Sequence, residues 1–263
     1  MYYGIIKTTK GEKRMLTKER HDLILQMLKQ KRAVTVTELT KELEASESTI
    51  RRDLSVLDKE KKLIKVHGGA TALEDEFISF EADVATKSVL NIQEKHAVGK
   101  YAASLINKED FVYIDAGTTT ETMIDYIENN GAVFVTNGIA HARKLIQRGC
   151  KAYVIGGELK LSTEAIVGAE GVSNIKKYNF TKCFLGTNAI AVDQGFTTPD
   201  IEEALMKQEA SKRSHITYVL ADHTKFGRVS SVTFENLSDA CVITDYVTEE
   251  KYKKSTIIKE VLK

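Results

Sequence analysis

Residues 46–57 read S-E-S-T-I-R-R-D-L-S-V-L, and the spacing of their apolar residues predicts a helix. At roughly 100° per residue, Ile50, Leu54 and Leu57 fall on one side, which we expect to be buried. The polar residues on or beside the opposite side are Ser48, Thr49, Arg51, Arg52, Ser55 and Lys59. This helix therefore presents hydroxyl and guanidinium groups, and an arginine fork can pair bidentately with guanine or with phosphate.

Two further helices are predicted before this one. Thr17 is expected to cap a helix that runs to about Lys29, and Thr37 a short helix that ends at a tight turn, Glu44-Ala45. Ser46 then caps the third helix. Two short helices joined by a brief turn form the helix-turn-helix pattern, whose second helix contacts the major groove of DNA.

The segment 63–70, L-I-K-V-H-G-G-A, combines β-prone residues with a Gly-Gly turn and predicts a small wing. Its backbone and Lys65 or His67 can lie along phosphates. A charged helix face is more often merely solvated, and a lone histidine more often structural, but helix and wing together favour DNA binding. The predicted DNA contacts are Thr37, Ser46, Ser48, Thr49, Arg51, Arg52, Ser55, Lys65 and His67.

The charge distribution agrees with a DNA-binding front. Residues 1–73 hold 16 Lys and Arg residues against 10 Asp and Glu, a net charge of +6, whereas the whole chain has +1, so the remainder carries −5. A basic segment ahead of an acidic body indicates that only the front meets a polyanion. We expect a winged helix-turn-helix domain over residues 15–72 that binds a double-stranded DNA operator.

Composition excludes several other classes. The chain shows no apolar run of membrane-spanning length and no signal peptide, so a cytoplasmic protein is expected. The three cysteines, Cys150, Cys183 and Cys241, are odd in number and lack C-x-x-C spacing, which argues against a disulfide framework or a zinc site. No cofactor is predicted.

The first fourteen residues show no amphipathic period, and a second methionine, Met15, stands just before the first predicted helix. The peptide K-G-E-K-R at 10–14 can be encoded by a purine-rich stretch that contains a bacterial ribosome-binding sequence. We expect residues 1–14 to be a translated leader without a fold. The alternative is a disordered arm that touches DNA.

The rest of the chain predicts an α/β domain. Residues 73–90 are expected to form a linker, and a helix follows from Asn91 to about Ile106. The expected strands are residues 111–115, 132–136, 151–155, 181–186, 215–221 and 240–244. The expected helices lie near 119–129, 139–148 and 200–212, with another after Thr248. This alternation predicts a largely parallel sheet with helices on both faces over residues 91–263.

Five of these strands end in glycine, hydroxyl, amide or acidic residues. The endings are D-A-G-T-T-T (115–120), T-N-G (136–138), G-G-E (156–158), G-T-N (186–188) and A-D-H-T-K-F-G (221–227). Parallel strands bring these ends to one edge, where open α/β sheets bind ligands. Thr118–Thr120 at a helix start favour an anion such as phosphate, and Lys207 and Lys225 can add positive charge. Each ending alone is an ordinary turn, but together they favour a pocket.

The motifs resemble one family throughout residues 15–245. S-E-S-T-I-R-R-D-L-x-x-L and V-H-G-G-A resemble the winged helix of the DeoR family of bacterial repressors. I-D-A-G-T-T-T, V-T-N, I-G-G, V-G-A-E, T-T-P-D-I-E-E-A and V-L-A-D-H-T-K-F-G resemble its sensor domain, in family order. The sequence departs from the family at Lys65, where arginine is frequent, and at Thr187-Asn188-Ala189, where relatives often have a more glycine-rich turn.

The resemblance implies a sensor fold shared with ribose-5-phosphate isomerase and a phosphorylated sugar as effector. The effector contacts that it implies are Asp115, Gly117, Thr118, Thr119, Asn137, Gly156, Gly157, Lys207, Asp222 and Lys225. D-A-G-T-T-T and T-T-P-D-I-E-E look most like Gram-positive repressors of fructose operons. Fructose 1-phosphate is therefore the first expected effector, ahead of tagatose 6-phosphate or another sugar phosphate. The family and the symmetry of helix-turn-helix operators imply a homo-oligomer, dimer or tetramer.

The alternative is a sugar-phosphate isomerase or deaminase with an accessory DNA-binding domain. Carboxylates such as Asp115, Glu170 and Asp222 could then act as general bases. The chain shows no Ser-His-Asp signature, Walker loop or metal-ligand spacing. We expect a repressor without enzymatic activity, and an activator of the same architecture stays open.

Overall fold

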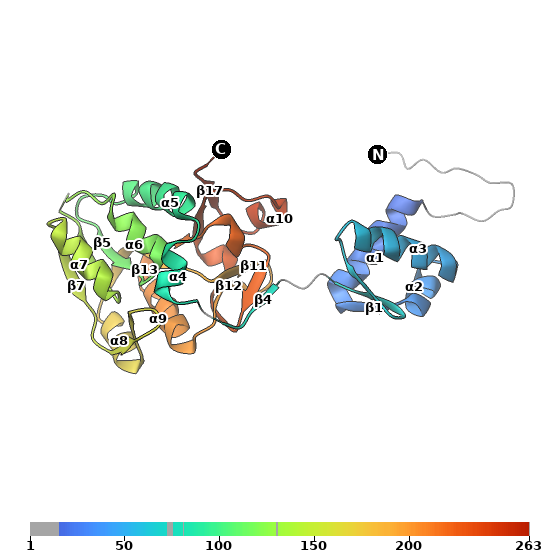
Figure 1. Cartoon of the computed structure of the whole chain (residues 1–263), viewed down its shortest axis with the longest axis horizontal. Helices are drawn as coiled ribbons and strands as arrows, with labels where there is room; N and C mark the ends of the chain where they lie inside the picture. Colours follow the sequence, from blue (N-terminus) through green and yellow to red (C-terminus); the bar gives the residue numbers. More distant parts are fainter. Residues whose placement is uncertain (1–15, 73–75, 81, 130, 263) are drawn as a thin grey trace. The chain divides into compact units, whose positions relative to one another are not determined.

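The computed structural model describes residues 16–72, 76–80, 82–129 and 131–262, and the chain divides into two compact units after residue 74 (Figure 1). The leader or arm expected over residues 1–14 lies outside the described residues. Within them, no helix combines the length and the apolar composition needed to cross a bilayer.

The first unit is a winged helix-turn-helix. Its elements in chain order are α1 (Thr17–Lys31), β1 (Ala33–Thr35), α2 (Val36–Glu42), α3 (Glu47–Lys59), β2 (Ile64–Val66) and β3 (Gly69–Thr71). The three strands form an antiparallel sheet in the order β1-β3-β2. The predicted wing is the β2–β3 hairpin, which turns at Gly68 with a positive φ of 85°. The fold predicted for this unit is confirmed.

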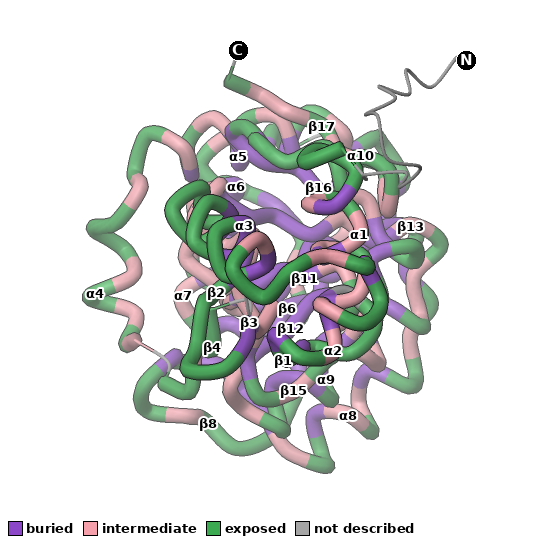
Figure 2. Tube along the Cα trace, turned by 90° about the vertical axis from the view of Figure 1, so that its right-hand side faces the viewer, coloured by how far each residue is buried: buried purple, intermediate pink, exposed green. Residues whose placement is uncertain are grey.

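The core of the first unit contains the predicted seam of α3. Ile50, Leu54 and Leu57 are all fully buried, and they pack with apolar side chains of α1, α2 and the small sheet. Figure 2 shows the exposed residues along the outside of α3. The apolar period of residues 46–57 was therefore sufficient to place this helix.

One cap prediction is confirmed and two are wrong. Ser46 caps α3, because its Oγ accepts a hydrogen bond from the Thr49 amide at 3.3 Å. The cap of α2 is Thr35, whose Oγ1 accepts from the Glu38 amide at 3.1 Å, so the predicted cap Thr37 lies inside the helix. Strand β1 ends at Thr35 and Val36 is buried, which starts the helix earlier than expected. Similarly, α1 has Leu16 at its N-cap rather than Thr17.

The second unit contains a seven-stranded parallel sheet. Its strands are β5 (Phe111–Ile114), β6 (Val133–Thr136), β7 (Lys151–Val154), β10 (Phe180–Gly186), β13 (Ser214–Leu220), β16 (Cys241–Thr244) and β17 (Ile258–Glu260). The strand order is β17-β16-β13-β10-β5-β6-β7. The six strands expected from the sequence are all present, to within one residue at each end. The seventh, β17, was not expected and follows the short helix α10 (Glu250–Lys253).

Helices cover both faces of this sheet, as predicted (Figure 1). One group is α5 (Ile92–Ser104), α6 (Thr118–Ile124) and α7 (Ile139–Gln147), and the other is α8 (Ala169–Ile175) and α9 (Ile201–Lys212). Successive residues of β5 point to opposite groups: Val112 and Ile114 pack with α5 and α6, whereas Tyr113 packs with α8 and α9. Both faces of the sheet are thus buried, as in doubly wound α/β proteins.

Several short elements were not expected. They are β4 (Glu76–Ile78), α4 (Val84–Ser88), β8 (Glu158–Lys160), β9 (Ala165–Val167), the helix α8, β11 (Ala189–Ala191), β12 (Gly195–Thr198), β14 (Arg228–Ser230) and β15 (Val232–Glu235). Two of them lie where a linker was expected, over residues 73–90. Strand β4 pairs with β14, and α4 lies against α6, both within the second unit. All but α8 have three to five residues, which is too short to produce a recognisable hydrophobic period.

Candidate functional site

The first candidate surface is the exposed side of α3 and the adjoining wing. Arg51 and Arg52 are both exposed, and Arg51 donates to Glu47 Oε1 through Nη2 at 2.6 Å and through Nε at 2.9 Å. Among the described residues, the Arg52 guanidinium has no hydrogen-bond or ion-pair partner. An exposed arginine at the start of a recognition helix can pair with a base edge or a phosphate.

Hydroxyl groups surround these arginines. Ser46 Oγ lies 3.0 Å from Ser48 Oγ and 2.8 Å from Thr49 Oγ1. Lys65 of β2 donates through Nζ to Ser55 Oγ of α3 at 2.8 Å, so the wing and the recognition helix meet. The structure thus brings these predicted residues onto one polar surface.

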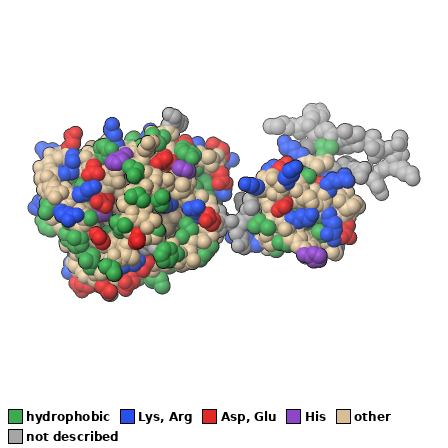
Figure 3. Space-filling view, in the orientation of Figure 1, with side chains coloured by type: hydrophobic (Ala, Val, Ile, Leu, Met, Phe, Trp, Pro, Cys, Tyr) green, Lys and Arg blue, Asp and Glu red, His purple; other side chains and the backbone are tan. Residues whose placement is uncertain are grey.

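The last two predicted DNA contacts are also exposed. Thr37 lies in the first turn of α2, and His67 lies at the tip of the wing beside Gly68. Figure 3 shows Lys and Arg side chains at several places on the face of this unit that is turned toward the viewer.

A buried ion pair, which sequence reasoning missed, holds α3 against α1. Arg20 Nη2 donates to Asp53 Oδ1 at 3.0 Å, and His21 Nε2 lies 3.1 Å from the same oxygen. Burial alone would raise the pKa of Asp53, but the hydrogen bonds from Arg20 and His21 lower it below its ordinary value. Only the position of Asp53 near the apolar seam of its helix hinted at this role.

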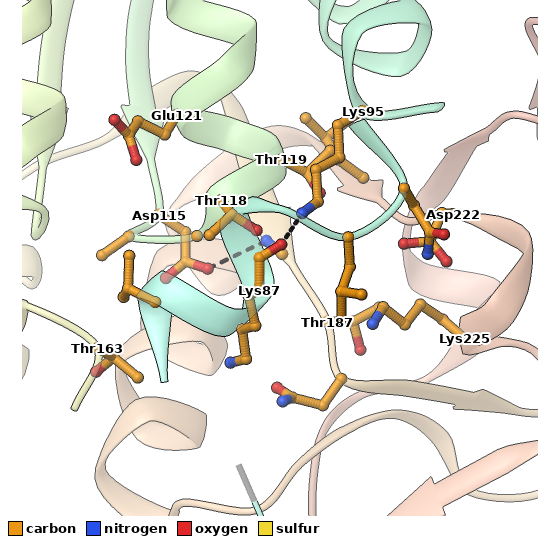
Figure 4. A pocket seen from close by; sticks show the side chains of 18 of the residues that line it. Lys87, Lys95, Asp115, Thr118, Thr119, Glu121, Thr163, Thr187, Asp222 and Lys225 are labelled. Atoms are coloured by element: carbon orange, nitrogen blue, oxygen red, sulfur yellow. Dashed lines mark hydrogen bonds between the residues drawn. The ribbon is translucent and has the colours of Figure 1, made fainter. Parts of the chain in front are cut away.

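The second candidate site is a cavity of about 200 Å³ in the second unit. It lies at the carboxyl ends of β5, β10 and β13, and it is lined by the residues that follow each of these strands (Figure 4). The chain passes from β5 to β6 on one side and later places β10 on the other side, so the strand order reverses at β5. Ligands bind at such switch points in open α/β sheets.

Most of the predicted effector residues line this cavity. They are Asp115, Gly117, Thr118, Thr119, Lys207, Asp222 and Lys225. The strand endings at 115–119, 186–188 and 220–225 thus meet as the topology requires. These endings belong to three of the five strands that were expected to contribute.

The remaining predicted residues do not line the cavity. Asn137 is buried and supports the loop after β5, because its Oδ1 accepts from the Ala116 amide at 2.8 Å and its Nδ2 donates to Ile166 O at 3.2 Å. Gly156 and Gly157 lie beyond β6, on the side away from the switch point. A Cβ on Gly157 would lie 2.6 Å from Val167 O, so this glycine permits close packing against β9.

Asp115 and Lys207 form a buried pair in the cavity wall. Lys207 Nζ donates to Asp115 Oδ2 and, at 3.2 Å, to Gly186 O, and the Gly186 amide donates to the same Asp115 oxygen at 3.1 Å. The two side chains are only 3% and 6% exposed. Because Asp115 compensates its charge, Lys207 does not provide the excess positive charge that was expected of it.

Besides Lys207 and Arg228, three lysines that different elements supply bring positive charge to the cavity, and we call them the lysine cluster. Lys87 comes from α4, Lys95 from α5 and Lys225 from the 3₁₀ turn His223–Lys225 that follows β13, and their side chains converge on the cavity (Figure 4). Lys95 is buried and its Nζ donates to the Lys87 carbonyl. Burial lowers the pKa of Lys95 and of Lys225, and Lys87 lowers both further by repulsion. Lys87 was missed because it stood in the expected linker, and Lys95 was missed although it stood in the helix expected from Asn91.

Asp222 is a carboxylate whose charge acts on this lysine cluster, where it raises the pKa of both Lys95 and Lys225. The Thr224 amide donates to its Oδ1 at 3.0 Å. Burial alone would raise the pKa of Asp222, but Lys225, Thr224 and Asn91 together lower it. A carboxylate with a lowered pKa is a weak base, and it is suited to accept hydrogen bonds from hydroxyl groups.

Of the other acidic residues in the cavity wall, two contact lysine side chains and one is exposed to solvent. Glu203 Oε1 accepts from Lys160 Nζ at 2.9 Å and from Thr163 Oγ1 at 2.8 Å. Glu121 lies 3.5 Å from Lys144, and Glu164 is exposed in the turn between β8 and β9. Glu170, the third carboxylate considered as a general base, does not line the cavity, and its Oε1 accepts from Asn174 Nδ2 at 2.9 Å.

Comparison with protein families matches both units. Residues 20–76 match the DeoR-like helix-turn-helix domain, and residues 90–246 match the DeoR C terminal sensor domain. The chain is 43% identical over 251 residues to the uncharacterized HTH-type transcriptional regulator FruR of Bacillus subtilis, which covers 94% of this chain and 99% of that protein. It is 33% identical to the lactose phosphotransferase system repressor of Staphylococcus aureus, over 89% of this chain and 94% of that one.

Among solved structures, ribose 5-phosphate isomerase A from Methanocaldococcus jannaschii superimposes with a TM-score of 0.40 at 12% identity, over 52% of this chain and 55% of that one.

Proposed function

The chain belongs to the DeoR family of transcriptional regulators, as its motifs indicated, and on this premise we propose that it represses a sugar-utilisation operon and is released from DNA by a phosphorylated sugar. The most similar relatives named above include a repressor of a lactose phosphotransferase system, which supports repression as the mode of action. The protein acts by binding, and no catalytic step is part of the proposal.

DNA recognition is assigned to α3 and the wing. Arg52, Arg51 and Ser48 face away from the buried seam, and Lys65 adds a charge from the wing. We infer that Arg52 reads a base edge, while Arg51 and Lys65 contact phosphates, because Arg51 is already oriented by Glu47.

The observation that carries the effector proposal is the lysine cluster. Lys87, Lys95 and Lys225 all line the cavity, Lys87 and Lys95 both repel the charge of Lys225, and the charge of Asp222 acts on both Lys95 and Lys225. Buried cations that repel one another are stabilised by an anion. A phosphate monoester, with a charge of about −1.5 to −2 at pH 7, supplies the missing negative charge.

The sugar itself is expected to meet the remaining walls. The Asp115–Lys207 pair, Asp222, Thr187 and Asn188 offer both donors and acceptors beside the lysine cluster. A polyhydroxylated ligand needs both kinds of partner, whereas a simple inorganic anion needs only donors. We therefore propose a sugar phosphate rather than a free phosphate ion.

Fructose 1-phosphate is the first candidate effector and tagatose 6-phosphate the second. The first is supported by the motifs shared with fructose-operon repressors and by the higher identity to FruR of B. subtilis, 43% against 33% for the lactose system repressor. Both are hexose phosphates, so the lysine cluster would bind either in the same manner.

Release from DNA requires that the effector prefer one arrangement of the protein. A ligand that binds both arrangements equally shifts nothing. Coupling of about 1–3 kcal/mol, a 5- to 150-fold change in operator affinity, is sufficient. We propose that a homo-oligomer presents two winged helices to a two-fold repeated operator, since helix-turn-helix proteins read paired half-sites.

A thermal-shift screen of the full-length protein against a panel of sugar phosphates tests the proposal. A ligand that binds only the folded state raises the melting temperature as its concentration increases. We expect a hexose phosphate to raise it, the corresponding unphosphorylated sugar not to, and the same hexose phosphate to release a fluorescent operator. If no sugar phosphate shifts the melting temperature, the assigned effector class is wrong.

A further inference from the structure

An ion pair joins strand β4 to a residue of the cavity wall. We call the segment that contains this strand the strap. Its first half is β4 with residues 79–80, and its second half is residues 82–90, which contain α4. Strand β4 pairs with β14, the Glu76 amide donates to Gly227 O at 3.0 Å, and Ser230 Oγ donates to Ile78 O at 2.6 Å. Phe77 and Phe80 are 62% and 78% exposed, so these apolar side chains contribute little to holding the strap. Its first half is attached by polar contacts.

Arg228 connects this attachment to the cavity. Its Nε lies 2.9 Å from Glu76 Oε2 in an ion pair, and Arg228 is also one of the residues that line the cavity. Arg228 begins β14 and stands three residues after Lys225 of the lysine cluster. If Arg228 exchanges its partner, both the cavity wall and the attachment of β4 therefore change.

The strap is the first described part of the second unit after the first unit ends at residue 74. Residues 73–75 join the winged helix to β4 in the sequence. The two matched family domains end at residue 76 and begin at residue 90, so the strap belongs almost entirely to neither. A signal that leaves the cavity along the chain must pass through it.

We propose that Arg228 is a further ligand of the effector phosphate and that the phosphate competes with Glu76 for it, so that effector binding detaches β4. The inference rests on the proposed function, since it requires a phosphorylated effector in the cavity. The planar guanidinium can bind a phosphate bidentately, whereas it now holds one oxygen of a carboxylate that is 66% exposed. The doubly charged phosphate is the stronger partner, and an exposed ion pair is weak enough to be exchanged.

The two halves of the strap should respond in opposite directions. Lys87 on α4 belongs to the lysine cluster, so the effector should hold α4 more firmly, while β4 loses its ion pair with Arg228. Detachment of β4 lengthens the stretch of chain between the sheet of the second unit and the winged helix, which lowers the effective concentration of one winged helix beside the other on the operator.

The test compares Glu76→Gln and Arg228→Gln with the wild type, in full-length protein, using fructose 1-phosphate and tagatose 6-phosphate as probes. Glu76→Gln removes the competitor, so the probe should bind about 2- to 5-fold more tightly, the range that an exposed ion pair can supply. Operator affinity without probe should fall by a similar factor. Arg228→Gln should bind the probe more weakly. The matched control is Glu249→Gln, which removes an exposed ion pair with Lys251 on α10, and it should change neither affinity.

Hydrogen exchange supplies a second readout that does not depend on the variants. Adding the probe to the wild type should speed amide exchange in residues 76–80 and slow it in residues 84–90. If amide exchange slows in both halves of the strap, or if Glu76→Gln binds the probe no more tightly than the wild type, the phosphate does not compete with Glu76 for Arg228. If the wild type binds neither probe nor any other sugar phosphate, the proposed function fails and this inference with it. If the wild type binds the probe and releases the operator, but Glu76→Gln has the same probe affinity as the wild type, this inference alone is overturned.

Discussion

Lys207 Nζ donates to Asp115 Oδ2 in the wall of the cavity, although the two residues stand 92 positions apart in the sequence. Asp115 directly follows β5 and Lys207 lies in α9, so the pair fastens the helix to the strand end at the point where the sheet reverses its order. The pair offers a donor and an acceptor to a ligand while remaining neutral as a whole.

Lys207→Ala should destabilise the sensor unit as well as impair its response to the effector. It leaves the Asp115 carboxylate buried without its partner, which costs about 3–5 kcal/mol of unfolding free energy. Urea unfolding measures this loss. Lys212→Ala, an exposed lysine on the same helix, is the control and should change stability little. Equal stability of the two variants would show that Asp115 has another compensating partner.

Arg52→Ala should weaken specific operator binding by about 1–3 kcal/mol and relax base preference at one position. Effector affinity should not change, because Arg52 lies in the other unit. Fluorescence anisotropy with specific and scrambled DNA measures the operator affinity and the preference for the operator sequence. Arg52→Lys is the control: it keeps the charge, so binding to scrambled DNA should persist while specificity falls. Unaltered operator affinity in Arg52→Ala would remove this residue from the interface.

Lys95→Gln and Lys225→Gln should each reduce hexose phosphate affinity by about tenfold or more, since a hydrogen bond to a charged group contributes about 1.5–3 kcal/mol. Isothermal titration calorimetry measures the affinity. Lys100→Gln removes an exposed lysine from the same helix as Lys95 and should bind like the wild type. If all three variants bind equally, the phosphate does not occupy the lysine cluster.

Effector affinity should follow a bell-shaped dependence on pH. It should rise between about pH 5 and 7, as the phosphate loses its second proton near pH 6. At alkaline pH it should fall, because burial lowers the pKa of Lys95 and Lys225 below 10.5 and their charges are lost earlier than that of an ordinary lysine. Calorimetric titrations across this range check both limbs. A flat alkaline limb up to pH 10 would contradict the lowered pKa values.

Asp53→Asn should destabilise the winged-helix unit at neutral pH, by about 3 kcal/mol if the loss matches that of other buried pairs. The pKa of Asp53 is lowered in the folded state, so its stabilising contribution is fully present above the ordinary value of 3.8 and is lost as the pH falls through the lowered pKa. Urea unfolding at pH 7 and at pH 3 should therefore show a smaller difference between variant and wild type at the lower pH. A difference that grows on acidification would reverse this assignment.

Local periodicity predicted most of the secondary structure. The buried seam of α3, the six main strands and the helices between them each depend on residues close together in the sequence. The grouping of strand endings also followed, because parallel strands bring their carboxyl ends to one edge whatever their order. The unexpected elements are short and lack such a period, as β4 and α4 show.

Tertiary structure decided what the endings do. The strand order β13-β10-β5-β6-β7 places the loops of the first three strands around the cavity and carries Gly156 and Gly157 away from it. It also buries Asp115 against Lys207, and it brings Lys87 from an apparent linker beside Lys95 and Lys225. Such pairings depend on burial and charge between residues far apart in the chain. A sequence period records only which side of an element is apolar, so the sequence by itself determined the elements of this protein. Packing between these elements determined which charged side chains are buried and which of them lie together.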